Sequence, residues 1–324
     1  MNMRILKLNF NSTINQFRNI IDSKLREVYL DGPDNMVETA NFVMSAKGKR
    51  IRPILTMLSC DALGGKIDDV VNVAIAIELL HNFTLVHDDI MDQDNLRHGQ
   101  PTVHKKWDIS TAVLTGDSLL WLSLDMLKKT KIKREDIILH FIDAIKLVCE
   151  GQAYDKMFEN KEYVSIKDYE KMISMKTGYM IGLCSHLGSI CAKADKDVQK
   201  NMKEYGLEIG KAYQIQDDFM EVYSSEEVMK KSLTSDIELN KKTYMVCLAY
   251  DMDPEGYRGL IKSDISSTEK LVLLRQYFEE TKIKERAMDE INQSFNKAKQ
   301  ILNNIDFKKN YLLELNSFLK NRGN

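Results

Sequence analysis

The chain has 324 residues, of which 44% are hydrophobic and 29% are charged, and its formal net charge is −2. This composition is ordinary for a soluble protein with a sizeable core, and it excludes a broadly basic nucleic-acid-binding protein. With only four prolines, fifteen glycines and no Ser/Gly/Pro-rich linker, the chain is expected to form a single domain over residues 1–324.

The hydrophobic periodicity is helical nearly throughout. Residues 68–92 are apolar almost all round, which is typical of a helix that is buried on every side. Residues 134–158 and 200–223 are long amphipathic segments, and Ser165 with Asp168 gives a capping signal for a helix start. We find no convincing β-alternation between hairpin turns and no repeat of fixed period. The sequence therefore predicts a large all-α bundle.

Three aspartates in five residues end the first apolar segment, in LVHDDIMD. On an α-helix, residues four apart lie on one face, about 6 Å apart along the axis. Asp88 and Asp92 therefore point the same way, with Asp89 on the flank. Two oxygen ligands aimed together suit Mg²⁺, which keeps waters and shares itself with substrate phosphates. Taken alone, the motif could equally be a solvated helix end.

A second acid cluster, formed by Asp217, Asp218 and Glu221, also ends an apolar helix. Cations in loop or apolar settings accompany the two clusters: Lys176, Lys231 and Lys241, with Lys49, Arg50 and Arg52 in GKRIRP. If the two acid clusters face each other, they would hold Mg²⁺ ions, and the ions and cations together would hold diphosphates.

Six motifs occur in the order seen in the trans-isoprenyl diphosphate synthases, which include the farnesyl, geranylgeranyl and longer-chain polyprenyl synthases. They are GKRIRP, ELLHNFTLVHDDIMD, LRHGQPTVH, EGQAYD, MKTG and YQIQDD. From about Gly48 to Thr243 the chain therefore resembles this family. The resemblance implies an isoprenoid synthase-type bundle of long, mostly antiparallel helices around a central cavity, working as a homodimer.

The activity that the resemblance implies is a magnesium-dependent prenyl transfer. An allylic diphosphate would sit between the acid clusters, bridged by about three Mg²⁺ ions, and metal and lysines would stabilise the departing diphosphate. The double bond of isopentenyl diphosphate would then attack the allylic cation, and a proton would be lost. No protein nucleophile is required, which agrees with the absence of a Ser/His/Asp or Cys/His signature.

The family's site residues carry over position by position. The implied metal ligands are Asp88, Asp89, Asp92, Asp217, Asp218 and Glu221. The implied allylic diphosphate site comprises Asp88, Asp92, Arg97, Lys176, Thr177, Gln214, Lys231 and Lys241, and its last five members are also the implied catalytic residues. The implied isopentenyl diphosphate site comprises Gly48, Lys49, Arg52, His81 and His98. His81 lies two helical turns before Asp88, so the two can share a cavity.

Several positions depart from the family pattern. His98 stands where a second arginine is usual, and an imidazole grips phosphate less firmly than a guanidinium, so weaker binding of isopentenyl diphosphate is expected. Glu221 replaces an aspartate in the second acid motif. Lys230, Thr234 and Asn240 replace glycines in the loop that follows, which leaves its backbone less free.

Product length is expected to depend on the residues before the first acid motif. There, Phe83 is followed by the small Thr84, and Leu80 lies further down the helix. This pattern resembles the archaeal-type geranylgeranyl synthases, so mainly a C20 product is implied, with the C15 product of a farnesyl synthase as the alternative. A helical wheel places Thr84 and Leu80 beneath Asp88 but turns Phe83 well away from it.

Three other functions fit parts of the sequence. A class I terpene cyclase would share the fold and the ionisation chemistry, but it would not need GKRIRP, and its second metal motif usually has an Asn/Ser/Glu pattern. A modulatory, non-catalytic synthase subunit typically loses an acid motif, whereas this chain keeps both. A ferritin-like di-metal bundle needs Glu-x-x-His pairs, which are absent.

The sequence also gives an expectation for location. We read no apolar run near the roughly 18 residues that cross a bilayer, no secretory signal in MNMRILKLNFNST and no lipidation box in KNRGN. The five cysteines, Cys60, Cys149, Cys184, Cys191 and Cys247, are scattered without a CxxC pair. Since such a pattern indicates neither a disulfide framework nor structural zinc, we expect a cytoplasmic protein with no transmembrane segment.

Overall fold

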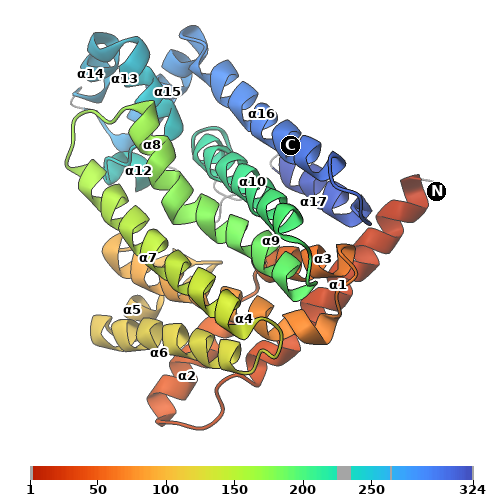
Figure 1. Cartoon of the computed structure of the whole chain (residues 1–324). Helices are drawn as coiled ribbons and strands as arrows, with labels where there is room; N and C mark the ends of the chain where they lie inside the picture. Colours follow the sequence, from red (N-terminus) through yellow and green to blue (C-terminus); the bar gives the residue numbers. More distant parts are fainter. Residues whose placement is uncertain (1–2, 225–234, 263–264, 323–324) are drawn as a thin grey trace. The chain divides into compact units, whose positions relative to one another are not determined.

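The computed structural model describes residues 3–224, 235–262 and 265–322, and these residues are helical along most of their length (Figure 1). This confirms the all-α prediction. The chain divides into two compact units. The first comprises Met1–Ile142, Leu183–Lys203 and Leu302–Leu315, and the second comprises Asp143–Gly182, Glu204–Ile301 and Asn316–Asn324. The expectation of one domain over residues 1–324 stays a prediction.

The helices wholly inside the first unit are α1 (Met3–Arg26), α2 (Asp34–Met44), α3 (Ile51–Ala62), α4 (Ile67–Met91), α5 (Val103–Lys106) and α6 (Ile109–Lys128). Those wholly inside the second are α8 (Ile166–Ile173), the π-helical turn η1 (Ser174–Gly178), α12 (Ser235–Glu238), α13 (Tyr244–Met252), α14 (Pro254–Ile261) and α15 (Ser267–Glu280). The division falls within α7 (Arg134–Glu159), α9 (Tyr179–Cys191), α10 (Lys196–Tyr223), α16 (Ile283–Asn303) and α17 (Asn310–Lys320).

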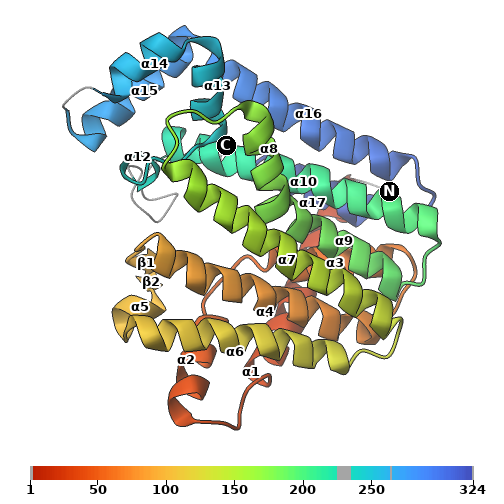
Figure 2. The same ribbon diagram turned by 60° about the vertical axis from the view of Figure 1, so that its left-hand side comes forward.

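The first unit is built around α4, which ends in the first acid motif. Helices α3 and α6 pack against it, and Figure 2 shows α4 and α6 side by side. The two helices run antiparallel, since Asn72 lies near Lys129 at one end and His87 near Val113 at the other. Burying each large aliphatic side chain of α4 contributes about 1.5–3 kcal/mol, which is why a helix that is apolar all round sits here. The sequence prediction for residues 68–92 is confirmed.

Helix α4 also bears on the membrane expectation. In the part of the chain that the structure describes, it is the one helix of 25 residues that is long and apolar enough to cross a membrane. The expectation that no apolar run approaches the length needed to cross a bilayer is therefore wrong. Because 67% of its most apolar window is buried in the protein, the helix equally fits the core helix of a soluble protein.

The one helix start that the sequence predicted from a capping signal is confirmed. Ser165 caps α8, because its hydroxyl oxygen accepts a hydrogen bond from the backbone N–H of Asp168 at 3.1 Å. One element was missed. The strands β1 (Leu96–Arg97) and β2 (Gln100–Pro101) form an antiparallel hairpin directly after α4, and two residues per strand are too few to show alternation.

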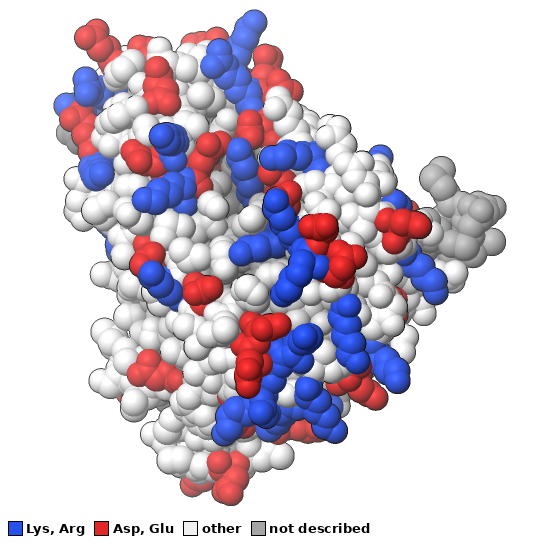
Figure 3. Space-filling view, viewed as in Figure 1, with Lys and Arg blue, Asp and Glu red and all other residues white. Residues whose placement is uncertain are grey.

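The charged surface agrees with the near-zero net charge. On the face shown in Figure 3, acidic and basic side chains are interspersed. With the charges mixed in this way, specific ionic sites must arise from local geometry.

Candidate active site

The first acid motif divides its three carboxylates between two environments. Asp89 is only 4% exposed, and the Arg97 guanidinium donates to it from Nε at 2.8 Å and from Nη2 at 2.5 Å. Arg97 also donates to Asp94 at 2.7 Å, so the hairpin β1–β2 is tied to the end of α4. Asp88 and Asp92 are half-buried on the neighbouring face. Asp89 therefore faces an arginine of its own unit, while Asp88 and Asp92 are more exposed to solvent.

Burial dominates the electrostatics of this motif. It raises the pKa of the Asp89 carboxyl to about 6, although the positive charge of Arg97 acts in the opposite direction. Removing one partner of such a buried pair costs about 3–5 kcal/mol, because the other charge is left uncompensated. The Asp89–Arg97 pair thus supports the end of α4, while the metal-ligand role of Asp89 and the allylic-site role of Arg97 stay predictions.

The first unit brings together three of the residues predicted to bind isopentenyl diphosphate, namely Arg52, His81 and His98. Arg52 Nη1 lies 3.1 Å from Nε2 of His81. Burial, then the charges of Arg52, His98 and other neighbours, lower the pKa of His81 well below its usual value. His81 is therefore neutral and accepts from Arg52. Arg52 Nε is buried without a hydrogen-bond partner among the described residues, and an unsatisfied cationic donor fits an anionic ligand.

The Arg50 side chain is buried in the protein, whereas its neighbour Lys49 in GKRIRP is exposed. Arg50 is buried at φ 52°, and its guanidinium donates to Asp22 at 3.0 Å, to Glu78 at 2.8 Å and to two backbone carbonyls. It therefore anchors the turn before α3, and Lys49 on one side remains exposed. The sequence grouped Arg50 with Lys49 and Arg52, and only the structure separates the anchor from the exposed lysine.

His98 occupies the tip of the hairpin. It is exposed, with φ 54°, and is followed by Gly99 with φ 77°. Two successive positive φ values are typical of the tight turns that join short antiparallel strands. Histidine is one of the side chains that tolerate this conformation better than most. The departure from arginine at this position thus coincides with a backbone requirement.

The predicted chain-length residues lie on two faces of α4. Leu80 is fully buried, and Thr84 is half-buried and donates to the backbone carbonyl of His81 at 2.8 Å. Phe83 is 8% exposed and its ring contacts His87. The structure therefore agrees with the helical wheel, which turned Phe83 away from the face of Asp88.

In the second unit, Asp218 is the inward-facing member of the second acid motif. It is buried and accepts hydrogen bonds from the Tyr169 hydroxyl at 2.6 Å, Gln214 Nε2 at 3.0 Å and the Tyr244 N–H at 2.8 Å. These contacts join α8, α10 and α13. Gln214 in turn accepts from Thr177 at 2.8 Å, so two predicted allylic-site residues are connected to this carboxylate.

The other two carboxylates of this motif differ in exposure. Asp217 has a 40% exposed side chain and pairs with Arg322, whose guanidinium stacks 3.7 Å from the ring centre of Tyr213. Glu221 is buried. Asp217 is therefore the most accessible ligand candidate of the second motif.

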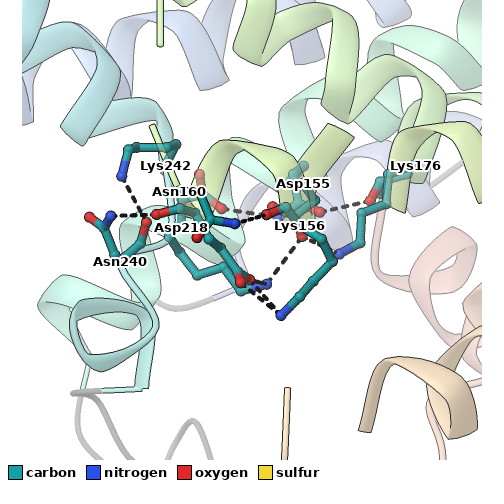
Figure 4. Close-up of polar contacts among 11 residues, drawn as sticks. Asp155, Lys156, Asn160, Lys176, Asp218, Asn240 and Lys242 are labelled. Atoms are coloured by element: carbon teal, nitrogen blue, oxygen red, sulfur yellow. Dashed lines mark hydrogen bonds and ion pairs between the residues drawn. The ribbon is translucent and has the colours of Figure 1, made fainter. Parts of the chain in front are cut away.

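Lys176 and Lys241 meet at Asp155, as Figure 4 shows in part. Their Nζ atoms lie 2.6 and 3.3 Å from the same carboxylate oxygen, and Lys241 also pairs with Glu159 at 2.7 Å. Burial alone would raise the pKa of Asp155, but the two ammonium groups hold it below its usual value. Two lysines predicted to bind one diphosphate are thus held side by side.

Asp155 is a residue of this cluster that the sequence analysis missed. The motif EGQAYD was recognised, but its aspartate was given no role. In the same motif, a Cβ at Gly151 would lie 2.6 Å from the backbone nitrogen of Lys176, so glycine permits the close approach of α7 to η1. The available sequence signal was that Asp155 follows Gly151 by one helical turn, which places both residues on the same face of α7.

Asn240, near Lys241, explains one departure from the family pattern. It has φ 53°, where glycine is favoured and asparagine is the best-tolerated replacement, and its side chain donates to the carbonyl of Glu159 at 2.6 Å. Lys231, together with Lys230 and Thr234, lies outside the described residues.

The donor set fits magnesium without forming a complete cage. Within residues 3–224, 235–262 and 265–322, no group of three or more His, Cys, Asp and Glu side chains is arranged to hold a metal ion. Mg²⁺ commonly binds through one or two carboxylates together with waters and substrate phosphates. Asp88 with Asp92, and Asp217, carry partly exposed carboxylates of this kind.

Comparison with known proteins gives consistent matches. Residues 33–280 match the polyprenyl synthetase family. A geranylgeranyl diphosphate synthase of Saccharolobus solfataricus is 36% identical over 272 residues, covering 82% of this chain and 80% of that protein. A geranylfarnesyl diphosphate synthase of Natronomonas pharaonis is 31% identical over 279 residues, covering 80% and 81%. The crystal structure of a geranylgeranyl pyrophosphate synthetase from Pyrococcus horikoshii superposes with a TM-score of 0.89 at 31% identity, covering 98% and 99%.

Proposed function

Because the chain belongs to the polyprenyl synthetase family, we propose that it is a trans-prenyltransferase that condenses isopentenyl diphosphate with an allylic diphosphate. The observation that carries the proposal is the pairing of Lys176 and Lys241 on Asp155, in the unit that also holds the second acid motif. One buried carboxylate holds both ammonium groups adjacent, and a diphosphate needs that arrangement of positive charge.

The residues of each unit have distinct tasks in this reaction. When bound, Mg²⁺ supplies Lewis-acid stabilisation of the leaving diphosphate; Asp88 with Asp92 in the first unit, and Asp217 in the second unit, would each hold such an ion. Lys176 and Lys241 bind the allylic diphosphate and stabilise its growing charge as the C–O bond ionises.

The isopentenyl diphosphate is bound by a separate group of side chains. Arg52 donates to its diphosphate, and neutral His81 orients the guanidinium by accepting one of its N–H groups. The double bond then attacks the allylic cation, and the proton lost from the new product is taken by the released diphosphate. No protein nucleophile takes part.

We propose geranylgeranyl diphosphate as the main product, with farnesyl diphosphate as the runner-up. Support comes from the names of the relatives and from Phe83 and Thr84 before the first acid motif. Because one relative is named geranylfarnesyl diphosphate synthase, a longer C25 product is a further outcome to measure.

We further propose that the protein is a cytoplasmic homodimer. Helix α6 carries exposed apolar side chains, among them Ile109 at 60%, Leu114 at 51% and Trp121 at 44% exposure. Apolar side chains gathered on one helix are typical of a surface that another protein covers. Size-exclusion chromatography with light scattering tests the dimer, and a monomer at all concentrations would refute it.

The reaction is tested by incubating the protein with labelled isopentenyl diphosphate, Mg²⁺ and each allylic primer in turn, followed by product chromatography. We expect a labelled prenyl diphosphate, mainly C20. A product that forms from the allylic diphosphate alone would instead indicate a terpene cyclase. No elongation with any primer would refute the proposed function.

A further inference from the structure

His87, directly before Asp88, is seated against α6. A Cβ at Gly116 would lie 2.2 Å from Nε2 of His87 and 2.4 Å from its Cδ2, so the ring occupies the space that glycine leaves free. The same Nε2 lies 3.3 Å from the backbone oxygen of Val113. Helices α4 and α6 lie side by side at this point (Figure 2). The imidazole is therefore held by the backbone of the neighbouring helix.

The ring of His87 also contacts Phe83. The two ring centres are 4.8 Å apart with an interplanar angle of 65°, an edge-to-face arrangement. The residues are one helical turn apart, so they share a face of α4. Since Phe83 is buried, its ring can change position only if neighbouring space opens or closes.

We propose that His87, seated over Gly116, is a positioning residue that fixes the ring of Phe83 and thereby sets the length of the prenyl product. The inference rests on the proposed function, in which Phe83 before the first acid motif is one of the residues on which product length depends. His87 acts through Phe83 and touches neither diphosphate. Gly116 contributes by leaving room for the imidazole.

Two variants change this arrangement in different ways. His87→Ala removes the ring beside Phe83, so the phenyl group can swing into the vacated space and longer products form. We expect the ratio of C25 to C20 product to rise about tenfold, the discrimination that a methylene-sized change gives in an apolar pocket. Gly116→Ala displaces the imidazole by overlap, and we expect it to change the ratio of C15, C20 and C25 products.

Controls separate positioning from loss of structure. His87→Gln keeps a donor for Val113 but no ring, and it should lengthen the product as His87→Ala does, which provides a test if the alanine variant does not fold. Gly259→Ala is the matched glycine variant, because a Cβ there meets nothing within 4 Å. It should leave the product ratio unchanged. Thermal unfolding of each variant identifies those that are folded.

The decisive measurement is a double-mutant comparison of product ratios. If His87 acts through Phe83, then Phe83→Ala shifts the ratio, and adding His87→Ala or Gly116→Ala produces no further shift. The proposal is overturned if the folded His87 and Gly116 variants keep the wild-type ratio, if their effects persist in the Phe83→Ala background, or if Phe83→Ala itself has no effect. A wild-type protein that elongates no primer would instead refute the proposed function.

Discussion

The two acid motifs have nearly the same sequence, but their inward-facing carboxylates are held by different partners. In the first motif, Asp89 is buried against the charged guanidinium of Arg97. In the second, Asp218 is buried among donors that include the Tyr169 hydroxyl and the Tyr244 N–H. In both motifs the second aspartate of the adjacent pair supports the fold, while its neighbour, Asp88 or Asp217, is more exposed. The shared pattern therefore combines one buried carboxylate with one that is more exposed.

Activity should distinguish the two kinds of carboxylate most strongly. We expect Asp88→Ala and Asp217→Ala to lower turnover by about a thousandfold or more, because the diphosphate leaving group loses a metal ligand. The helical circular dichroism signal should stay at the wild-type level, since neither side chain is deeply buried. Steady-state assays with saturating Mg²⁺ check this prediction, and near-wild-type turnover in either variant would contradict the metal assignment.

Stability should separate the two structural aspartates from each other. Asp89→Ala leaves the Arg97 charge without its buried partner and should cost about 3–5 kcal/mol of unfolding free energy. Asp218→Ala leaves polar donors unsatisfied and should cost about 1–3 kcal/mol. Urea unfolding measures both. Equal losses would show that the charge of the partner does not matter.

The pH dependence of stability should be specific to the first motif. Burial raises the pKa of Asp89 from 3.8 to about 6. Because the native state then binds this proton more tightly than the unfolded state, its ionisation lowers stability by about 3 kcal/mol as the pH rises from about 4 to about 6. Urea unfolding over this range should show the decline in the wild type and not in Asp89→Asn. Parallel curves for the two proteins would contradict the assignment.

The smallest expected effect concerns His98. His98→Arg should lower the KM for isopentenyl diphosphate by less than about tenfold, because a guanidinium binds phosphate bidentately at any pH. The gain is limited by the positive φ at this position, which an arginine adopts less readily. The KM measured across the titration range of histidine checks this. An unchanged KM would show that His98 does not contact the diphosphate.

Sequence reasoning succeeded for features that depend on a single helix. The apolar character of residues 68–92 predicted the buried helix α4, and the helical wheel correctly turned Phe83 away from Asp88. Both results depend only on the period of the α-helix.

Sequence reasoning failed where contacts with residues distant in sequence determine the position of a side chain. Arg50 lies inward because Asp22 and Glu78, each 28 residues away, receive its guanidinium. Asp155 organises Lys176 and Lys241, which come from other elements. A helical period gives the relative direction of side chains on one element, but it does not say which neighbouring element supplies the counter-charge.

Calorimetric titration of Mg²⁺ in the presence of inorganic diphosphate tests most directly whether the exposed carboxylates hold a metal–diphosphate complex. The account predicts binding by the wild type and by Asp89→Asn, and affinity weakened by about 10–100-fold or more in Asp88→Ala and in Asp217→Ala. Wild-type affinity in either alanine variant, or no Mg²⁺-dependent binding of diphosphate by the wild type, would contradict it.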